Sequence, residues 1–123
     1  MSTGKYTLVM GASDNPARYS YLAIQRLRAR GHEVYAIGLK KTRVADVDVA
    51  TEPQPWENVD TVTLYLNPTR QEPYYDYILG LKPRRIIFNP GTENPELEML
   101  ASEAGIECME ACTLVMLSTG QYT

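Results

Sequence analysis

Short apolar runs recur along the chain, and their length and composition predict β-strands. The runs are apolar on both faces, which is typical of strands in a parallel sheet that is covered on each side. A further candidate strand lies near Val47–Val49, inside an irregular stretch at residues 39–60. The five strands that the runs predict are Tyr6–Met10, Val34–Ile37, Thr61–Leu66, Arg85–Phe88 and Glu107–Met109.

Between these runs, apolar residues recur at helical spacing, and each helical stretch has a recognisable start. Asn15 followed by Pro16 predicts the first start, and Asn94 followed by Pro95 predicts the last. The start of the middle helix matches a capping box, with Thr69 and a Glu at position 72. Each of these helical patterns ends at a glycine that comes before a predicted strand, and these glycines are Gly31, Gly80 and Gly105.

The alternation of strands and helices predicts the fold class. A chain of 123 residues is long enough for one hydrophobic core, so we expect a single domain over residues 1–123. The order of elements predicts a doubly wound α/β fold with a mostly parallel, five-stranded sheet and helices on both faces. Residues 113–122 predict a short final helix.

The supply of reactive side chains is small and limits the chemistry. One histidine and two cysteines exclude a multi-histidine metal site within one chain and a disulfide scaffold. A hydrophobic share of 44% excludes a disordered chain, yet no apolar run is long enough to span a membrane. Residues 1–10 lack the apolar core of a signal peptide. We therefore expect a cytoplasmic protein that uses neither a membrane nor a metal.

Charge is divided unevenly behind a net value of −3. Residues 1–45 carry eight Lys or Arg and two acids, whereas residues 46–123 carry four Lys or Arg and thirteen acids. A basic first third predicts a bound anion or a nucleic-acid surface. Arg26, Arg28 and Arg30 also fit a solvated helix end, where cations complement the helix dipole. Nucleic acid is disfavoured because the whole chain is acidic and lacks an interleaved aromatic platform.

The turn after the first strand is the first candidate site, because ligands of such sheets bind beyond the carboxyl ends of the strands. Gly11 permits a tight turn ahead of a helix terminus, which favours an anion. Ser13 and Ser20 supply hydroxyl groups, and Arg18 supplies positive charge. The turn lacks a full Gly-x-Gly-x-x-Gly pattern and is not a Walker A loop, so a purely structural turn stays open as the alternative.

The end of the second strand bears on which nucleotide would bind. An NAD site has an acid there that bonds the ribose hydroxyls. This chain has Ile37-Gly38-Leu39-Lys40-Lys41 instead, with two ammonium groups in place of the carboxylate. Such groups fit a ribose that carries an additional phosphate, as in NADP or coenzyme A. Two solvated loop lysines are the alternative.

Taken in order, these blocks resemble the small stand-alone CoA-binding domain family. The first block is Gly11-Ala-Ser-x-x-Pro-x-Arg-Tyr-Ser20, and a helix, Gly31-His-Glu-Val-Tyr and the basic loop follow it. Family members are Rossmann-like and similar to the N-terminal domain of the succinyl-CoA synthetase α subunit. The resemblance spans roughly residues 5–122. Its later blocks are Val62-Thr-Leu-Tyr-Leu-Asn-Pro-Thr, Ile86-Ile-Phe-Asn-Pro-Gly-Thr-Glu, Ala104-Gly-Ile-Glu and Cys112-Thr-Leu-Val.

The resemblance implies a coenzyme A site at the carboxyl ends of the strands. In the family, the first turn wraps the pyrophosphate, the loop after the second strand holds the adenosine, and the next two long strands flank nucleotide and pantetheine. One departure is that many relatives have Asn-Pro where this chain has Gly38-Leu39. The implied binding residues are Gly11, Ala12, Ser13, Arg18 and Ser20 in the first turn, Ile37, Gly38 and Lys40 after the second strand, and Leu66, Asn67, Asn89, Pro90 and Gly91 beyond.

Three functional hypotheses follow. The first is a domain that binds coenzyme A or an acyl-CoA without catalysis, since the single histidine, His32, lies at the end of the sheet away from the candidate loops. The second is an NADP-binding regulatory or oxidoreductase domain. The third is an enzyme that handles acyl groups through the CoA thiol with Cys112, although Cys112 also fits a small buried side chain. The ligand is a small-molecule nucleotide in the first two cases, and homo-oligomerisation stays open.

Overall fold

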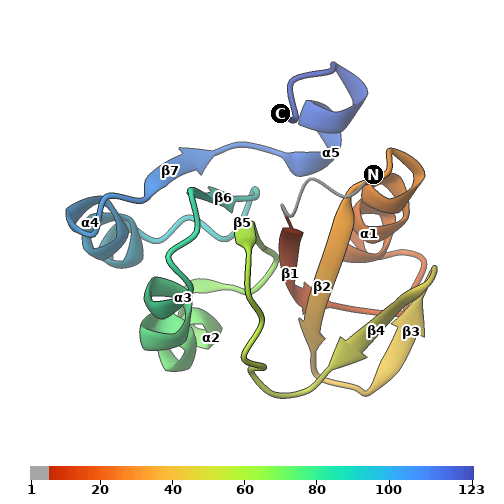
Figure 1. The fold of residues 1–123 in the computed structure, drawn as a ribbon, viewed down its shortest axis with the longest axis horizontal. Coiled ribbons are helices and arrows are strands. Elements are labelled where there is room, and N and C mark those ends of the chain that lie inside the picture. Colours follow the sequence, from red (N-terminus) through yellow and green to blue (C-terminus); the bar gives the residue numbers. More distant parts are fainter. Residues whose placement is uncertain (1–5) are drawn as a thin grey trace.

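The computed structural model describes residues 6–123, in which strands and helices alternate except over residues 33–64, where four strands follow one another (Figure 1). Residues 1–5 lie outside the described residues. They include Lys5 of the basic segment and half of residues 1–10, which lack the apolar core of a signal peptide. The strands are β1 (Tyr6–Ala12), β2 (Glu33–Gly38), β3 (Thr42–Val44), β4 (Val47–Ala50), β5 (Val59–Leu64), β6 (Arg85–Phe88) and β7 (Glu107–Glu110). The helices are α1 (Tyr19–Ala29), α2 (Pro68–Gln71), the 3-10 turn η1 (Glu72–Tyr74), α3 (Tyr75–Leu81), α4 (Pro95–Glu103) and α5 (Thr113–Ser118).

One sheet of seven strands runs through the structure in the order β3-β4-β2-β1-β5-β6-β7. Neighbouring strands are parallel except β3 and β4, which pair as an antiparallel hairpin. The chain first adds strands on one side of β1 and then returns to add β5 on the other side. This reversal creates a switch point between β2 and β5, over the end of β1, and confirms the doubly wound α/β class.

The predicted count of five strands is wrong, because residues 39–60 contribute the β3–β4 hairpin to the edge of the sheet. The candidate strand near Val47–Val49 is confirmed as β4, and β3 was not predicted. The hairpin turn contains Ala45 with a φ of 53°, in place of the Gly or Asn that would mark such a turn in a sequence. Arg28 of α1 holds the turn through two contacts to Asp46, at 2.8 and 2.9 Å.

Helices cover both faces of the sheet, as predicted. The sheet therefore separates the core into two layers, one on each face. Val9 of β1 packs in the layer of Ile24 and Leu27 from α1. The next residue back, Leu8, packs in the opposite layer with Ile78 from α3. Figure 1 shows α1 and α5 on one side of the sheet and α3 and α4 on the other. Within residues 6–123, no helix combines the length and the apolar character that a bilayer crossing requires.

The first helix begins later than predicted. The Asn15 side chain accepts a hydrogen bond from the Ala17 amide at 3.0 Å, and its carbonyl accepts one from the Arg18 amide at 3.0 Å. These bonds close a turn around Pro16, so the helix starts one turn further along, at Tyr19. The cap at Asn15 is therefore wrong, and the extra turn lengthens the connection between β1 and α1.

Of the two other predicted helix caps, one is wrong and one is confirmed. The capping box at Thr69 is wrong, because Asn67 caps α2 by accepting a hydrogen bond from the Arg70 amide at 3.0 Å. Asn-Pro comes soon after β5, and its asparagine caps the helix in place of the later threonine. The Asn94 cap of α4 is confirmed, with a hydrogen bond from the Leu97 amide at 3.3 Å. The short final helix is also confirmed as α5.

The chain's tail closes the amino-terminal end of the sheet. The Tyr122 ring lies 5.0 Å from the His32 ring, and the Arg85 guanidinium lies 4.7 Å from the centre of the Tyr122 ring. Burial lowers the pKa of His32, and the positive charges of Arg30 and Arg85 lower it further, so the imidazole is neutral at pH 7. His32 is thus half-buried in a packing role at the end of the sheet opposite to the carboxyl ends of the strands.

A matched pair of glycine substitutions tests how closely β1 and β2 meet. A Cβ at Gly38 would overlap the Ala12 carbonyl oxygen and lie 3.0 Å from Val49 Cγ1, so Gly38→Ala should lower the free energy of unfolding by about 2 kcal/mol or more. A Cβ at Gly80 in α3 meets nothing within 4 Å, so Gly80→Ala should raise it by about 0.5 kcal/mol. Urea denaturation of both variants measures the difference, and equal stabilities would contradict the close approach.

Candidate functional site

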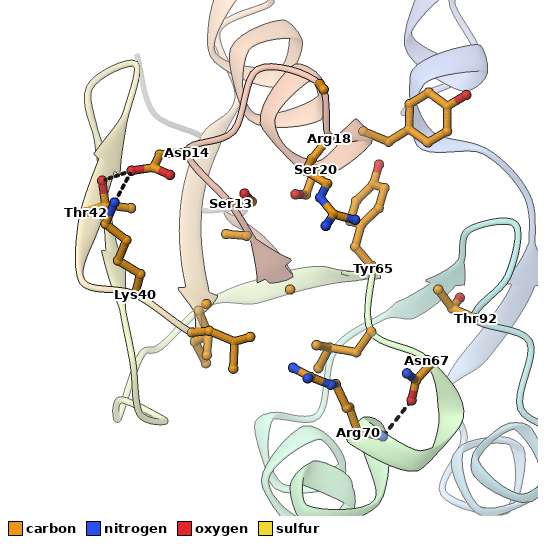
Figure 2. Close-up of a pocket in the computed structure, with 18 of the residues that line it drawn as sticks. Ser13, Asp14, Arg18, Ser20, Lys40, Thr42, Tyr65, Asn67, Arg70 and Thr92 are labelled. Carbon is orange, nitrogen blue, oxygen red and sulfur yellow. Dashed lines mark hydrogen bonds and ion pairs between the residues drawn. The ribbon is translucent and has the colours of Figure 1, made fainter.

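A cavity of about 710 Å³ opens at the carboxyl ends of β1, β2 and β5, which is where the strand order reverses. Three segments form most of it: the first turn with the start of α1, the loop after β2, and the connection from β5 into α2 (Figure 2). The lining residues are Gly11, Ala12, Ser13, Asp14, Ala17, Arg18, Tyr19, Ser20, Ile37, Gly38, Leu39, Lys40, Thr42, Tyr65, Leu66, Asn67, Arg70, Tyr74, Pro90 and Thr92.

Two glycines let the strand ends approach closely enough to form the floor of the cavity. Gly11 has a φ of 93° and sits at an irregularity in the pairing of β1 with β2. A Cβ on Gly11 would lie 2.9 Å from the Tyr65 carbonyl carbon. Gly38 approaches the Ala12 carbonyl in the same way. Any larger side chain at either position would push the three strand ends apart.

The start of α1 presents unpaired backbone donors to the cavity. Arg18 is the capping position, but no side chain accepts a hydrogen bond from the first turn, and this turn contains no acid. Four amide groups at a helix start have no intrahelical acceptor, and the helix dipole adds partial positive charge there. Ser20, which is buried, and Ser13 add hydroxyl groups beside them. The arrangement suits an anionic group of the size of a phosphate.

Arg18 and Arg70 reach the cavity from opposite walls. Figure 2 shows the Arg18 side chain descending from the start of α1 and the Arg70 side chain rising from α2 toward the same space. In the described part of the chain, neither guanidinium forms an ion pair or a hydrogen bond with a protein group. Both therefore retain their full charge and their planar set of donors for a ligand.

The remaining basic residues near the cavity are largely compensated. Lys40 lies 3.1 Å from Asp14, and Arg43 lies 3.6 Å from Asp48. Arg28 faces Asp46 at 2.8 Å, so the helix arginines are not all freely solvated. Three of the eight basic residues in the first third, Arg28, Lys40 and Arg43, are thus paired with acids. Lys41 is exposed and does not line the cavity.

Most of the residues expected to bind a ligand lie around this one cavity. Those that line it are Gly11, Ala12, Ser13, Arg18, Ser20, Ile37, Gly38, Lys40, Leu66, Asn67 and Pro90. Asn89 and Gly91 do not line it. Gly91 is exposed with a φ of 91°, and its amide donates to the Glu93 carboxylate at 2.9 Å. The positive φ of this turn explains why position 91 is a glycine, without a contact to a ligand.

Asn89 is a buried structural residue. Its side-chain amide donates to Thr63 Oγ1 at 2.7 Å and to the Leu64 carbonyl at 2.9 Å. Its Oδ1 accepts a hydrogen bond from the Thr113 amide at 2.9 Å. All three bonds lie within the protein, and the residue is 2% exposed. Asn89 thereby joins the end of β6 to β5 and to the start of α5, and it lies outside the residues that line the cavity.

Several lining residues were not among the predicted binding residues, and Arg70 is the most consequential of them. Arg70 is the single Lys or Arg between Arg43 and Lys82, and this isolation in an acidic stretch is a signal that could have revealed it. Tyr65, Tyr74 and Thr92 carry no comparable signal. A buried glutamine supports this wall, since Gln71 Nε2 donates to the Leu66 and Thr92 carbonyls, each at 2.8 Å.

The lining is poor in groups that transfer protons at neutral pH. Among residues 6–123, neither His32 nor a cysteine lines the cavity, and Cys112 is half-buried at the start of α5. Burial raises the pKa of Tyr65 to about 12, so its phenol stays protonated. Asp14 is the one acid among the lining residues, and it is already paired.

Comparison with known proteins agrees with the fold. The sequence model of a family described as the CoA binding domain matches residues 5–118. The chain belongs to the CoA-binding domain family. Comparison with curated proteins finds no significant match.

Solved structures place this CoA-binding domain protein among small proteins of the same architecture. A crystal structure of a protein described as uncharacterized has 53% sequence identity and a TM-score of 0.92, with 96% of this chain and 98% of that chain covered. Cell-free ID.343 from Thermus thermophilus has 22% identity and a TM-score of 0.84, with 96% and 90% covered.

A larger protein contains the same fold as a part. The dinucleotide-forming acetyl-coenzyme A synthetase 1 of Ca. Korarchaeum cryptofilum, in complex with phosphate and ADP, has 17% identity and a TM-score of 0.68. The match covers 89% of this chain and 26% of that chain. At this identity, and at that of the Thermus protein, the likeness supports the fold alone.

A substitution in the CoA-binding domain protein tests the structural role of Asn89. Asn89→Asp keeps the shape of the side chain but replaces the amide that donates to the Leu64 carbonyl with a carboxylate oxygen, which only accepts. This change should lower the free energy of unfolding by about 2 kcal/mol at neutral pH. The buried carboxyl has a raised folded-state pKa, so its protonation should return part of the stability as the pH falls from about 7 to about 5. Urea denaturation at both pH values measures this.

The matched control is Asn67→Asp, in which the exposed cap only accepts a hydrogen bond. Aspartate caps a helix as well as asparagine does, so its stability should stay within about 0.5 kcal/mol of the parent at either pH. A loss at Asn89→Asp that is equal at both pH values would contradict the assigned hydrogen bonds.

Proposed function

We propose that this protein binds coenzyme A, or an acyl-CoA, in the cavity at the carboxyl ends of β1, β2 and β5, and that it performs no catalytic step there. The observation that carries the proposal is the pair Arg18 and Arg70, which face one cavity from opposite walls without a protein partner in the described residues. Membership of the CoA-binding domain family supports the ligand.

The pyrophosphate of the ligand occupies the space between these arginines. It lies against the first turn and the uncapped start of α1, where backbone amides meet its oxygens. Each guanidinium can donate two parallel hydrogen bonds to a phosphate, and charge-assisted bonds of this kind are the strong ones. A dianionic pyrophosphate held between the two arginines would explain why neither is neutralised by an acid of the protein.

The two ends of the ligand follow from the direction of the walls. The adenosine lies toward Ile37, Gly38 and the exposed Leu39, whose apolar surface suits an aromatic base. The pantetheine lies toward Leu66 and Pro90 on the side of β5 and β6. Gly38 and Leu39 replace the Asn-Pro of many relatives, so the base meets a smaller and more apolar surface here.

A binding role without catalysis is supported by the chemistry of the lining. General acid–base catalysis needs a group whose pKa lies near the working pH and that reaches the reacting atom. The phenol of Tyr65 is fully protonated, and Asp14 is engaged by Lys40. Cys112 lies outside the lining, which disfavours a route through that thiol. The ligand then acts as the protein's signal or cargo.

Isothermal titration of the purified protein with coenzyme A, acetyl-CoA, NADP and NAD tests the proposal. Coenzyme A should bind, and Arg18→Gln or Arg70→Gln should each weaken it by about tenfold or more, as expected for loss of a charge-assisted contact. The matched control is Arg26→Gln, an exposed arginine of α1 outside the cavity, which should leave the affinity unchanged.

The alternative, an NADP-binding regulatory or oxidoreductase domain, makes the opposite forecast for the same titrations. No binding of coenzyme A at about millimolar concentration, together with saturation by NADP, would overturn the proposal. Equal effects of the Arg18, Arg70 and Arg26 substitutions would show that general charge, rather than the cavity, attracts the nucleotide.

A further inference from the structure

The wall of the cavity beside β2 contains a carboxylate from a distant part of the chain. Asp14 lies within the first turn, yet its Oδ2 lies 3.1 Å from Lys40 Nζ and accepts a hydrogen bond from Thr42 Oγ1 at 2.9 Å. Figure 2 shows the three side chains gathered on one wall. The end of β2 therefore has an acid beside it in space, although the sequence places two lysines there.

This contact changes the charge that a ligand meets at Lys40. The hydrogen bond from Thr42 and the contact with Lys40 hold the pKa of Asp14 below its usual range, so the carboxylate is ionised throughout the neutral range. The ammonium of Lys40 is accordingly compensated before any ligand arrives. A phosphate that approached Lys40 would also approach the Asp14 carboxylate, and like charges repel.

Resting on the proposed function, we propose that Asp14 is a positioning residue that sets the selectivity of the site for the ribose phosphate of the ligand. It holds Lys40 and keeps a negative charge beside it, and so weakens any preference for adenine nucleotides that carry a phosphate on the adenosine ribose. Arg18 and Arg70 still bind the pyrophosphate, which such ligands share with those that lack the ribose phosphate.

The site therefore accepts a class of ligand wider than coenzyme A itself. The parent protein binds dephospho-CoA nearly as tightly as coenzyme A, because the phosphate that distinguishes them meets a neutral pair. Releasing Lys40 from Asp14 should turn the same cavity into one that selects the phosphorylated ribose. The position of one carboxylate, two residues beyond the end of β1, decides between these two behaviours.

The experiment measures the ratio of the dissociation constants of dephospho-CoA and coenzyme A by isothermal titration. Asp14→Asn should raise this ratio by about fivefold in low salt, the size expected for a partly exposed pair acting on a phosphate. The increase should shrink at about 0.5 M salt, because exposed charges are screened. A ratio is insensitive to a general loosening of the first turn, which would weaken both ligands equally.

Two further variants separate the role of Asp14 from a general change of charge. Asp48→Asn removes an acid that pairs with Arg43 in the same basic segment but lies outside the cavity, so its ratio should match that of the parent. Adding Lys40→Gln to Asp14→Asn should abolish the increase, because no ammonium remains to be released.

The outcomes distinguish this inference from the proposed function. If the parent binds coenzyme A and Asp14→Asn leaves the ratio unchanged, the inference is wrong and the proposed function stands. An increase that Asp48→Asn reproduces, or that survives the loss of Lys40, also overturns it. If the parent binds neither ligand, the proposed function fails and the inference fails with it.

Discussion

The site depends on how closely β1, β2 and β5 approach one another where they end. Gly38 leaves room for the Ala12 carbonyl, and Gly11 leaves room for the backbone of Tyr65. Because no Cβ fits at either contact, the backbone itself forms the floor, and the loops that leave these strands diverge around a common space. Most side chains proposed to meet a ligand enter from one of those loops or from the helix that follows it, so the close approach determines where the cavity lies.

Electrostatics divide the cavity into regions of different character. Near the start of α1, unpaired amides and the guanidinium groups of Arg18 and Arg70 create a site of uncompensated positive charge. Near the end of β2, Asp14 neutralises Lys40. A phosphate gains most where no protein acid competes for the donor, so the pyrophosphate and the ribose phosphate of the proposed ligand would meet different electrostatic surroundings in the same cavity.

The two ends of the sheet have separate tasks. At the carboxyl ends, small residues and donors surround a cavity. At the amino-terminal end, Tyr122 packs against Arg85 and His32 and covers the strand starts. The groups with the richest acid–base chemistry therefore stabilise the fold, far from the ligand site.

Local patterns in the sequence determined the α/β class, the parallel core strands and the turn at Gly11, because strand runs, caps and glycines act through neighbouring residues. They also indicated most of the loops around the cavity, since parallel strands end at one edge. Only the tertiary structure decided the rest. Asn89 follows a strand exactly as Asn67 does, yet burial committed it to Thr63, Leu64 and Thr113. The charge at Lys40 depends on Asp14, and the freedom of Arg70 depends on the absence of a nearby acid in the described fold. Such properties are set by residues distant in sequence, and no local pattern encodes them.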